Sequence, residues 1–160
     1  MLYNKKLLFV SSNISSTQTG GGVCSLRNLD MCRRILGEEN VELYALKAFS
    51  FTGGTLITKL IFILKALLKL FCGYSNGSTQ KTDKEIVRIA KEGKFDFVFI
   101  DSSLNGHLVK SLNLEATGQV ICFFHNCERS MVIGQWKTGN ILSIIRPVSY
   151  THLTLPTNSL

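Results

Sequence analysis

Apolar runs alternate with amphipathic segments along the first third of the chain. An apolar run at residues 5–11 is followed by a polar, glycine-rich stretch at 12–22. Apolar side chains then recur every three or four positions over 23–36, which is helical spacing, and Gly37 is a typical C-terminal stop. A second apolar run covers 41–46. The pattern predicts strand, loop, helix and strand, the order of a βαβ unit.

The same alternation returns in the second half of the chain. We expect a helix over 83–92, with Thr82 as its cap, and another over 104–112. Apolar runs at 95–100 and 120–124 predict two more strands. Continuous apolar strands between helices are typical of a parallel sheet buried on both faces. The predicted fold class is α/β, a Rossmann-like, doubly wound parallel sheet.

The segment at 55–72 differs from the rest because it is strongly apolar but contains Lys59, Lys65 and Lys69. As a helix it places the three lysines on one side. Residues 56–71 would span about 24 Å, less than the roughly 30 Å of a bilayer core. Two readings remain open. The helix lies in the interface of an anionic membrane, or it packs on the sheet with its lysines in water.

Polar residues follow three of the predicted strands, at 13–22, 101–103 and 125–128. The carboxyl ends of parallel strands lie at one edge of a sheet, and ligands bind in the crevice there. We therefore expect these three loops to surround one site. The candidate substrate-binding residues are Gly20, Gly21, Gly22, Asp101, Ser102, Asn126 and Glu128.

The three consecutive glycines, Gly20 to Gly22, precede the first predicted helix. Glycine lets backbone N–H groups approach an anion closely, and a helix N-terminus carries partial positive charge. A phosphate or phosphosugar is the natural ligand. The glycines lack the spacing of a dinucleotide-binding fingerprint, and no Gly-Lys-Ser/Thr follows as in a P-loop. A strand-to-helix connection without any ligand is the alternative.

His125 is the candidate catalytic residue, because an imidazole at the end of a buried strand can act as a base or donate to a phosphate or hydroxyl. Asp101 either contacts a sugar hydroxyl or orients and caps a neighbouring helix. The grouping of Cys122, His125 and Cys127 does not have zinc-site spacing, so we predict no metal.

Four segments together resemble the N-terminal half of GT-B glycosyltransferases. They are residues 6–13, the glycines with Arg27-Asn28-Leu29, residues 95–103, and Phe123-Phe124-His125-Asn126-Cys127-Glu128. The resemblance is to retaining, family-4-like enzymes of bacterial capsule and surface-polysaccharide synthesis.

In that family two Rossmann-like domains face each other across a cleft. The resemblance implies that this chain supplies the domain that receives the acceptor, while the nucleotide sugar is held mainly by a C-terminal domain absent here. It also implies that Gly21 and Gly22 lie near the donor phosphates and that His125 faces the reacting sugar.

The end of the sequence differs in kind from the rest. Residues 148–157 resemble the translated read-through of a sequencing adaptor, and 148–160 carry no Lys, Arg, Asp or Glu. We therefore expect a truncated domain at 1–147 followed by a non-native tail. A genuine, unstructured C-terminus is the alternative.

Composition narrows the function classes. Among 160 residues 45% are apolar and 2 are proline, which excludes a disordered or collagen-like chain. The net charge of +7 suits an anionic membrane surface, but no basic patch with interleaved aromatics predicts nucleic-acid binding. Five cysteines, an odd number, and no secretory signal favour reduced thiols in the cytoplasm.

The expected function is that of a glycosyltransferase fragment. The complete enzyme would move a sugar from a nucleotide-sugar donor to a lipid-linked or saccharide acceptor, without a cofactor, in the cytoplasm or peripherally on the inner face of the cell membrane. The fragment alone is expected to be inactive. One alternative is a non-catalytic, membrane-docking subunit that recruits a separate catalytic chain. Another is a small nucleotide-binding protein, which would bind a nucleotide tightly by itself.

Overall fold

A computed structural model describes residues 4–14, 20–47, 54–71, 74, 78–102, 105–115 and 118–124 of the chain. Its elements in chain order are β1 (Leu7–Ser11), α1 (Gly20–Leu36), the 3-10 helix η1 (Glu38–Asn40), β2 (Val41–Ala45), α2 (Leu56–Phe71), α3 (Gln80–Glu92), β3 (Phe97–Ile100), α4 (Gly106–Glu115) and β4 (Gln119–Cys122).

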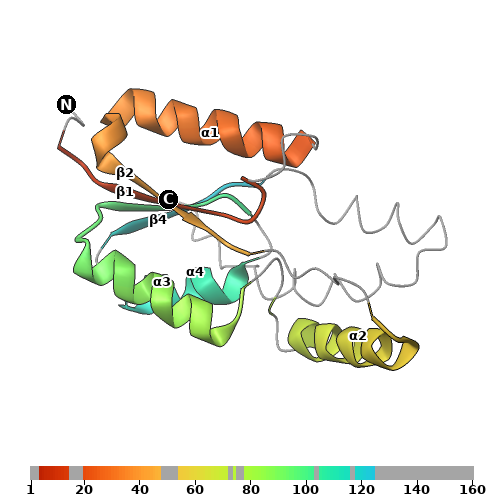
Figure 1. The fold of residues 1–160 in the computed structure, drawn as a ribbon. Coiled ribbons are helices and arrows are strands. Elements are labelled where there is room, and N and C mark those ends of the chain that lie inside the picture. Colours follow the sequence, from red (N-terminus) through yellow and green to blue (C-terminus); the bar gives the residue numbers. More distant parts are fainter. Residues whose placement is uncertain are drawn as a thin grey trace.

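The four strands form one parallel sheet in the order β2-β1-β3-β4. Helix α1 covers one face of the sheet, while α3 and α4 cover the other (Figure 1). The chain winds outward from β1 to β2 on one side, then crosses back to β3 and continues to β4 on the other. The fold is thus an α/β, Rossmann-like, doubly wound sheet, as the sequence predicts. Its topological switch point lies between β1 and β3.

Helices on both faces give the sheet two hydrophobic layers. Side chains alternate along β1, so Leu7 and Phe9 face α1 while Leu8 and Val10 face α3 and α4. The rings of Phe9 and Phe99 stack with their centroids 5.0 Å apart, joining β1 to β3 under α1. The two central strands, β1 and β3, are therefore buried by packing from both sides.

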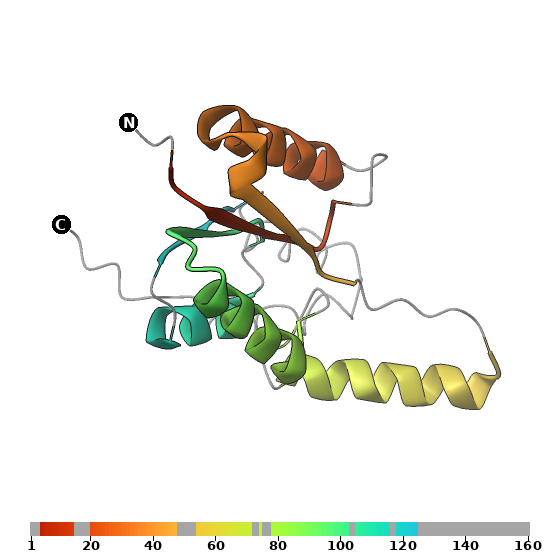
Figure 2. The same cartoon turned by 60° about the vertical axis from the view of Figure 1, so that its left-hand side comes forward.

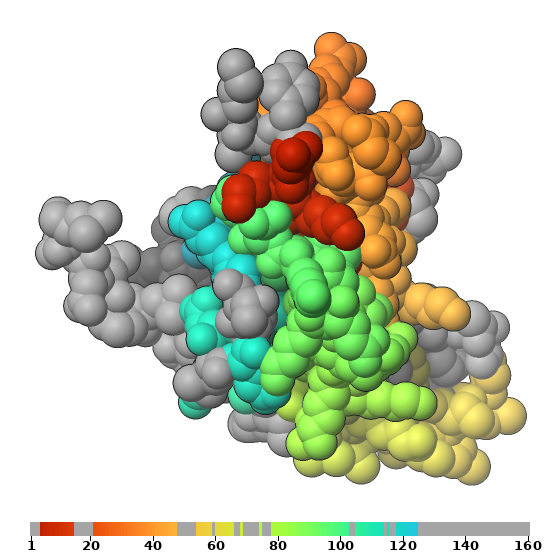
Figure 3. Space-filling model, turned by 90° about the vertical axis from the view of Figure 1, so that its left-hand side faces the viewer, coloured from red at the N-terminus to blue at the C-terminus, as the bar shows by residue number. Residues whose placement is uncertain are grey.

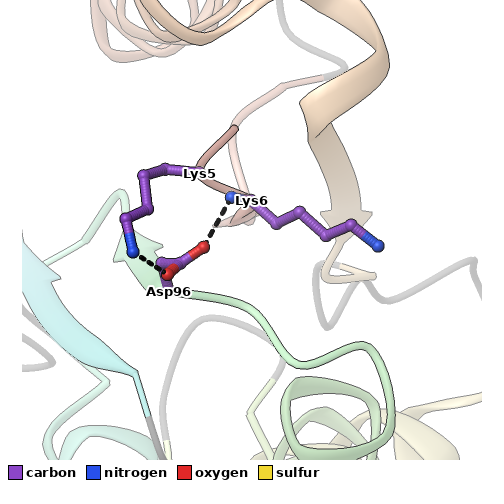
Figure 4. Close-up of polar contacts among 3 residues, drawn as sticks. All are labelled: Lys5, Lys6 and Asp96. Carbon is purple, nitrogen blue, oxygen red and sulfur yellow. Dashed lines mark hydrogen bonds and ion pairs between the residues drawn. The ribbon is translucent and has the colours of Figure 1, made fainter. Parts of the chain in front are cut away.

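Asp96 forms two polar contacts at the amino edge of the sheet, with Lys5 and Lys6 (Figure 4). The Lys6 backbone N–H donates to its Oδ2 at 2.9 Å, and the Lys5 ammonium donates to its Oδ1 at 2.6 Å. The hydrogen bond from Lys5, followed by that from Lys6, lowers the pKa of this carboxyl. The contact sets the register at which β1 and β3 begin, so it acts at the edge opposite the predicted site.

Several element boundaries differ from the prediction. Helix α4 covers Gly106–Glu115 rather than 104–112, and β3 begins at Phe97 rather than at residue 95. Helix α1 begins at Gly20, so the three glycines form its first turn rather than the end of a loop. Helix α3 begins at Gln80, and its cap is Thr79 rather than Thr82. Thr79 is extended, and its hydroxyl accepts from the Thr82 N–H at 3.2 Å. Both threonines suit a cap by residue type, and the backbone conformation decides between them.

Helix α2 is present over Leu56–Phe71, close to the predicted bounds. It extends away from the sheet and its covering helices (Figures 1 and 2). Its apolar side chains are largely in solvent, with Leu56 86% exposed and Leu60 69% exposed. These side chains are not packed on the sheet, which was one of the two interpretations of this segment.

Candidate functional site

The parallel register brings the strand ends to one edge, as the sequence argument requires. Val10 pairs with Ile100, and Ile100 pairs with Cys122. The ladder continues one step further, because the Asp101 N–H donates to the Val10 carbonyl at 2.9 Å and the Phe123 N–H donates to the Ile100 carbonyl at 2.8 Å. The segments that leave β1, β3 and β4 therefore depart from the same edge.

Two of the three predicted loops are described at this edge in part, and the third is not. Ser12 and Asn13 follow β1, and Asp101 and Ser102 follow β3. Phe124 is the last described residue after β4. The predicted residues His125, Asn126 and Glu128 lie outside the described residues, and their roles stay predictions.

The first turn of α1 is built from Gly20, Gly21 and Gly22. The first N–H groups of an α-helix receive no bond from within the helix, and the helix dipole makes this end partially positive. No acidic side chain lies in the first turn to neutralise that charge. A Cβ built on Gly21 would lie 3.7 Å from the Asn13 amide nitrogen, which places Asn13 beside this turn. A helix N-terminus of this kind is compatible with an anion, and binding of an anion here stays a prediction.

Asp101 is fully buried and links three elements. Ser11 donates from its hydroxyl to Asp101 Oδ2 at 3.0 Å, and Asn28 donates from its amide to Asp101 Oδ1 at 3.0 Å. Ser11 ends β1 and Asn28 lies on α1, so the carboxylate ties this helix to the two central strands. Of the alternatives for Asp101, the contacts support orienting a helix. Direct contact with a substrate stays a prediction.

The same helix connects Asp101 to the glycines. Ser25 is fully buried and donates from its hydroxyl to the Gly21 carbonyl at 2.9 Å, and Asn28 lies about one turn further along α1. Asp101 therefore lies under the second and third turns of the helix whose first turn carries the glycines. The glycine turn and Asp101 are therefore connected through α1, and the aspartate contacts this helix on the side that faces the sheet.

Two buried polar groups near this edge have no hydrogen-bond partner among the described residues. Asn105 is 1% exposed, and neither atom of its amide is bonded. The hydroxyl of Ser12 is also buried and unbonded. Buried polar groups are nearly always paired, so such exceptions mark places that call for a functional explanation. Asn105 precedes α4 and Ser12 follows β1, so the two residues lie on either side of the switch point.

Three residues of this edge, Ser11, Asn28 and Asn105, were not predicted from the sequence. Ser11 has a usable signal, because it shares the alternation of Leu7 and Phe9 and so belongs to the face beneath α1. Asn28 resembles any polar residue of a half-exposed helix, and its role depends on the tertiary position of α1. Asn105 resembles an ordinary helix cap in sequence, and its lack of a partner is visible in three dimensions alone.

Two cysteines, Cys32 and Cys122, are not activated nucleophiles. Burial raises the pKa of the Cys122 thiol to about 11, and this thiol donates to the Ser102 carbonyl at 3.4 Å. Burial also raises the pKa of Cys32. Both groups are therefore protonated thiols at neutral pH. Across the described ranges, no group of three His, Cys, Asp or Glu side chains is placed to hold a metal ion.

The predicted membrane residues lie on α2, away from the glycine turn (Figure 2). Lys65 is exposed, while the side chains of Lys59 and Lys69 lie outside what the structure describes. The helix contains no acidic residue. At 16 residues it falls short of a bilayer span, and no other helix in the described part of the chain meets the length and hydropathy needed.

Comparison of the chain with protein-family models, with curated proteins and with solved structures gives no match. The four sequence segments and the geometry of the carboxyl edge are therefore the observations that bear on function.

Proposed function

We propose that the chain is the acceptor-side domain of a GT-B glycosyltransferase. The complete enzyme would move a sugar from a nucleotide-sugar donor to a lipid-linked or saccharide acceptor. The observation that carries the proposal is the glycine first turn of α1 at the switch point of a doubly wound sheet. Such a turn accepts phosphate oxygens, and the crevice beside it is where open α/β sheets bind ligands.

The unpaired polar groups support a hydroxyl-rich ligand at the same edge. The Asn105 amide has a free donor and a free acceptor, and Ser12 has a free hydroxyl among the described residues. A saccharide hydroxyl both donates and accepts, so it can pair with either group. The buried Asp101 keeps α1 fixed while a ligand binds, which is the preorganisation that transfer chemistry needs.

The test is to sequence the source DNA beyond codon 147 and to express the reading frame found there. We expect the frame to continue into a second α/β domain, and the longer protein to release nucleotide from a nucleotide sugar when acceptor is supplied. His125→Ala should lower that rate at least tenfold, in line with loss of an acid or base, while Asp30→Ala on the outer side of α1 should not. A stop codon at that place, with no transfer by the chain, would contradict the proposal.

We also propose that α2 docks on an anionic membrane surface. Among the side chains of this helix that the structure describes, seven apolar ones are exposed, from Ile63 at 37% to Leu56 at 86%. Lysines without any acidic neighbour in the helix add attraction to anionic headgroups. This feature also favours the second candidate function, a membrane-docking subunit that recruits a separate catalytic chain.

Flotation with anionic and neutral vesicles tests the membrane proposal. Lys59→Glu, Lys65→Glu and Lys69→Glu together should abolish flotation with anionic vesicles. The matched control changes three exposed lysines outside α2 and alters the net charge equally; these are Lys47→Glu, Lys81→Glu and Lys110→Glu. Equal loss in both triple variants would indicate attraction through total charge, and unchanged flotation of the α2 variant would refute docking through α2.

A further inference from the structure

A groove of about 480 Å³ lies between α3 and α4, on the face of the sheet opposite α1. The two helices pack side by side there (Figure 3). Its lining includes Tyr74, Asp83, Val87 and Ser111. The groove thus combines a ring, a carboxylate, an apolar side chain and a hydroxyl, and none of these belongs to the glycine edge.

Asp83 is the unusual member of this lining. It is 4% exposed, and its Oδ1 accepts a 2.6 Å hydrogen bond from the buried Ser78 hydroxyl. Its Oδ2 is buried and has no partner among the described residues. A buried carboxylate oxygen without a donor is disfavoured, so this atom is suited to accept a hydrogen bond from a bound group.

An aromatic pair flanks the carboxylate. The rings of Tyr74 and His107 stack with centroids 4.8 Å apart and planes inclined by 21°. His107 lies near enough to Asp83 to interact with it electrostatically. Tyr74 also lines the groove, so the stacked pair holds an aromatic surface next to the carboxylate. Flat apolar surface beside a hydrogen-bonding carboxylate suits a ring-shaped ligand that carries hydroxyl groups.

The charges around the groove restrict the ligand further. A carboxylate oxygen can accept but cannot donate, so the ligand must bring an O–H or N–H group to Asp83. Lys84, Arg88 and Lys91 line the same groove and oppose a cationic ligand, although Arg88 is paired with Glu92 at 2.7 Å and Lys91 with Glu115 at 3.0 Å. Asp83 itself opposes an anion. A neutral molecule with several hydroxyl groups satisfies both conditions.

We propose that the groove between α3 and α4 binds an uncharged saccharide, with Asp83 Oδ2 accepting a hydrogen bond from one of its hydroxyls. The site lies in the helix layer opposite α1 and does not depend on the transferase proposal. It would hold a saccharide apart from the phosphate-binding edge.

Nuclear magnetic resonance on the full chain tests this site. Maltotriose, cellotriose, laminaritriose and chitotriose are the neutral probes, spermidine is the cationic probe, and inorganic phosphate is the anionic one. We expect at least one trisaccharide to shift the ring resonances of Tyr74 and His107 in a saturable way, and spermidine and phosphate to leave them in place. A panel in which no trisaccharide shifts these rings, or in which spermidine does so instead, overturns the proposal.

Substitutions inside and outside the groove test whether the trisaccharide binds there. Asp83→Ala should weaken the trisaccharide response at least tenfold, and Asp30→Ala, which removes a carboxylate on α1, should leave it unchanged. Ser111→Arg blocks the groove from α4 without altering Asp83, so it serves if the Asp83 variant does not fold. Retention of the response in Ser111→Arg would contradict binding in this groove. Phosphate binding at the glycine edge should survive both groove variants, which separates this proposal from the transferase proposal.

Discussion

At the scale of single residues, Asp101 connects the two central strands with α1 at the carboxyl edge. Its two carboxylate oxygens receive hydrogen bonds from Ser11 on β1 and Asn28 on α1. The group is fully buried, so each bond replaces hydration that the charge has lost. Hydrogen bonds to a buried charge contribute more than neutral ones. Asp101 thus helps to hold α1, and with it the glycine turn, against the two central strands.

Replacing Asp101 by Ala should lower the free energy of unfolding by about 2–4 kcal/mol, because two buried donors lose their acceptor. Asn28→Ala should cost about 1–3 kcal/mol, since it leaves the carboxylate with fewer partners. Urea unfolding of both single variants and of the double variant measures the coupling between the two residues. Strict additivity of the two losses would contradict the described hydrogen bond.

Asp83 and Asp96 should respond to pH in opposite directions. Desolvation raises the pKa of Asp83, against smaller opposing effects of Ser78 and His107. The folded protein therefore binds this proton more tightly than the unfolded chain does, and the stability due to this group is lost as pH rises from about 3.9, the ordinary Asp value, through the raised pKa. Urea unfolding over a pH series should show this loss, and Asp83→Asn should remove it.

The stability that Asp96 contributes depends on pH in the opposite direction from that of Asp83. Its hydrogen bond with Lys5, then that from the Lys6 N–H, lowers its pKa in the folded protein. Its stabilisation is present above the ordinary Asp pKa and is lost as pH falls through the lowered value. Asp96→Asn should flatten the acid side of the same series. A profile unchanged by either variant at its own end would show that the two carboxyls do not titrate as described.

At the scale of elements, the beginning of α3 tests the corrected cap. Thr79→Ala should lower the free energy of unfolding by about 1 kcal/mol, because the helix loses the acceptor for the Thr82 N–H. Thr82→Ala removes the hydroxyl partner of Thr79 at 2.7 Å but leaves the cap acceptor, so its cost should be smaller. Urea unfolding ranks the two variants, and a larger cost at Thr82 would restore the cap first expected from the sequence.

A variant in the first turn of α1 tests whether its glycines are needed for the fold or for the approach of a ligand. Gly21→Ala should stabilise the protein by about 0.5–1 kcal/mol, because alanine favours helix and the added methyl meets Asn13 at an ordinary contact distance. The same methyl should weaken phosphate binding by restricting approach to the backbone. Thermal unfolding without and with pyrophosphate separates the two effects. A stability loss would show that the glycine is needed by the fold itself.

The elements themselves were largely predictable, and the reason is hydrophobic periodicity. Leu7 to Val10 and Val98 to Ile100 form buried runs with no exposed position, which in this chain can only be strands of a sheet covered on both faces. The predicted starts of α1 and α3 were wrong because the residue types there are compatible with more than one conformation. Glycine suits both a loop and the first turn of α1, and two threonines suit the cap of α3.

At the scale of the whole molecule, the sequence predicts that the strand ends meet at the carboxyl edge of the sheet. It does not predict the strand order or the buried contacts at that edge. Parallel strands must end together, so the loops after β1 and β3 were expected at one edge. The strand order β2-β1-β3-β4 depends on how the chain returns from β2, which periodicity does not encode. Asn28 and Asn105 acquire their roles from that order, because they come to face the switch point through tertiary packing.

We propose that the glycine turn of α1 binds the phosphate of a sugar donor at the switch point. A titration of the isotopically labelled chain with pyrophosphate, followed through the backbone amide resonances, measures this binding at the glycines themselves. We predict saturable shifts at Gly20, Gly21 and Gly22, with smaller shifts at Ser12 and Asn105 across the same edge and none along α3. Shifts confined to other parts of the molecule, or glycine resonances that do not move at saturating pyrophosphate, would contradict the claim.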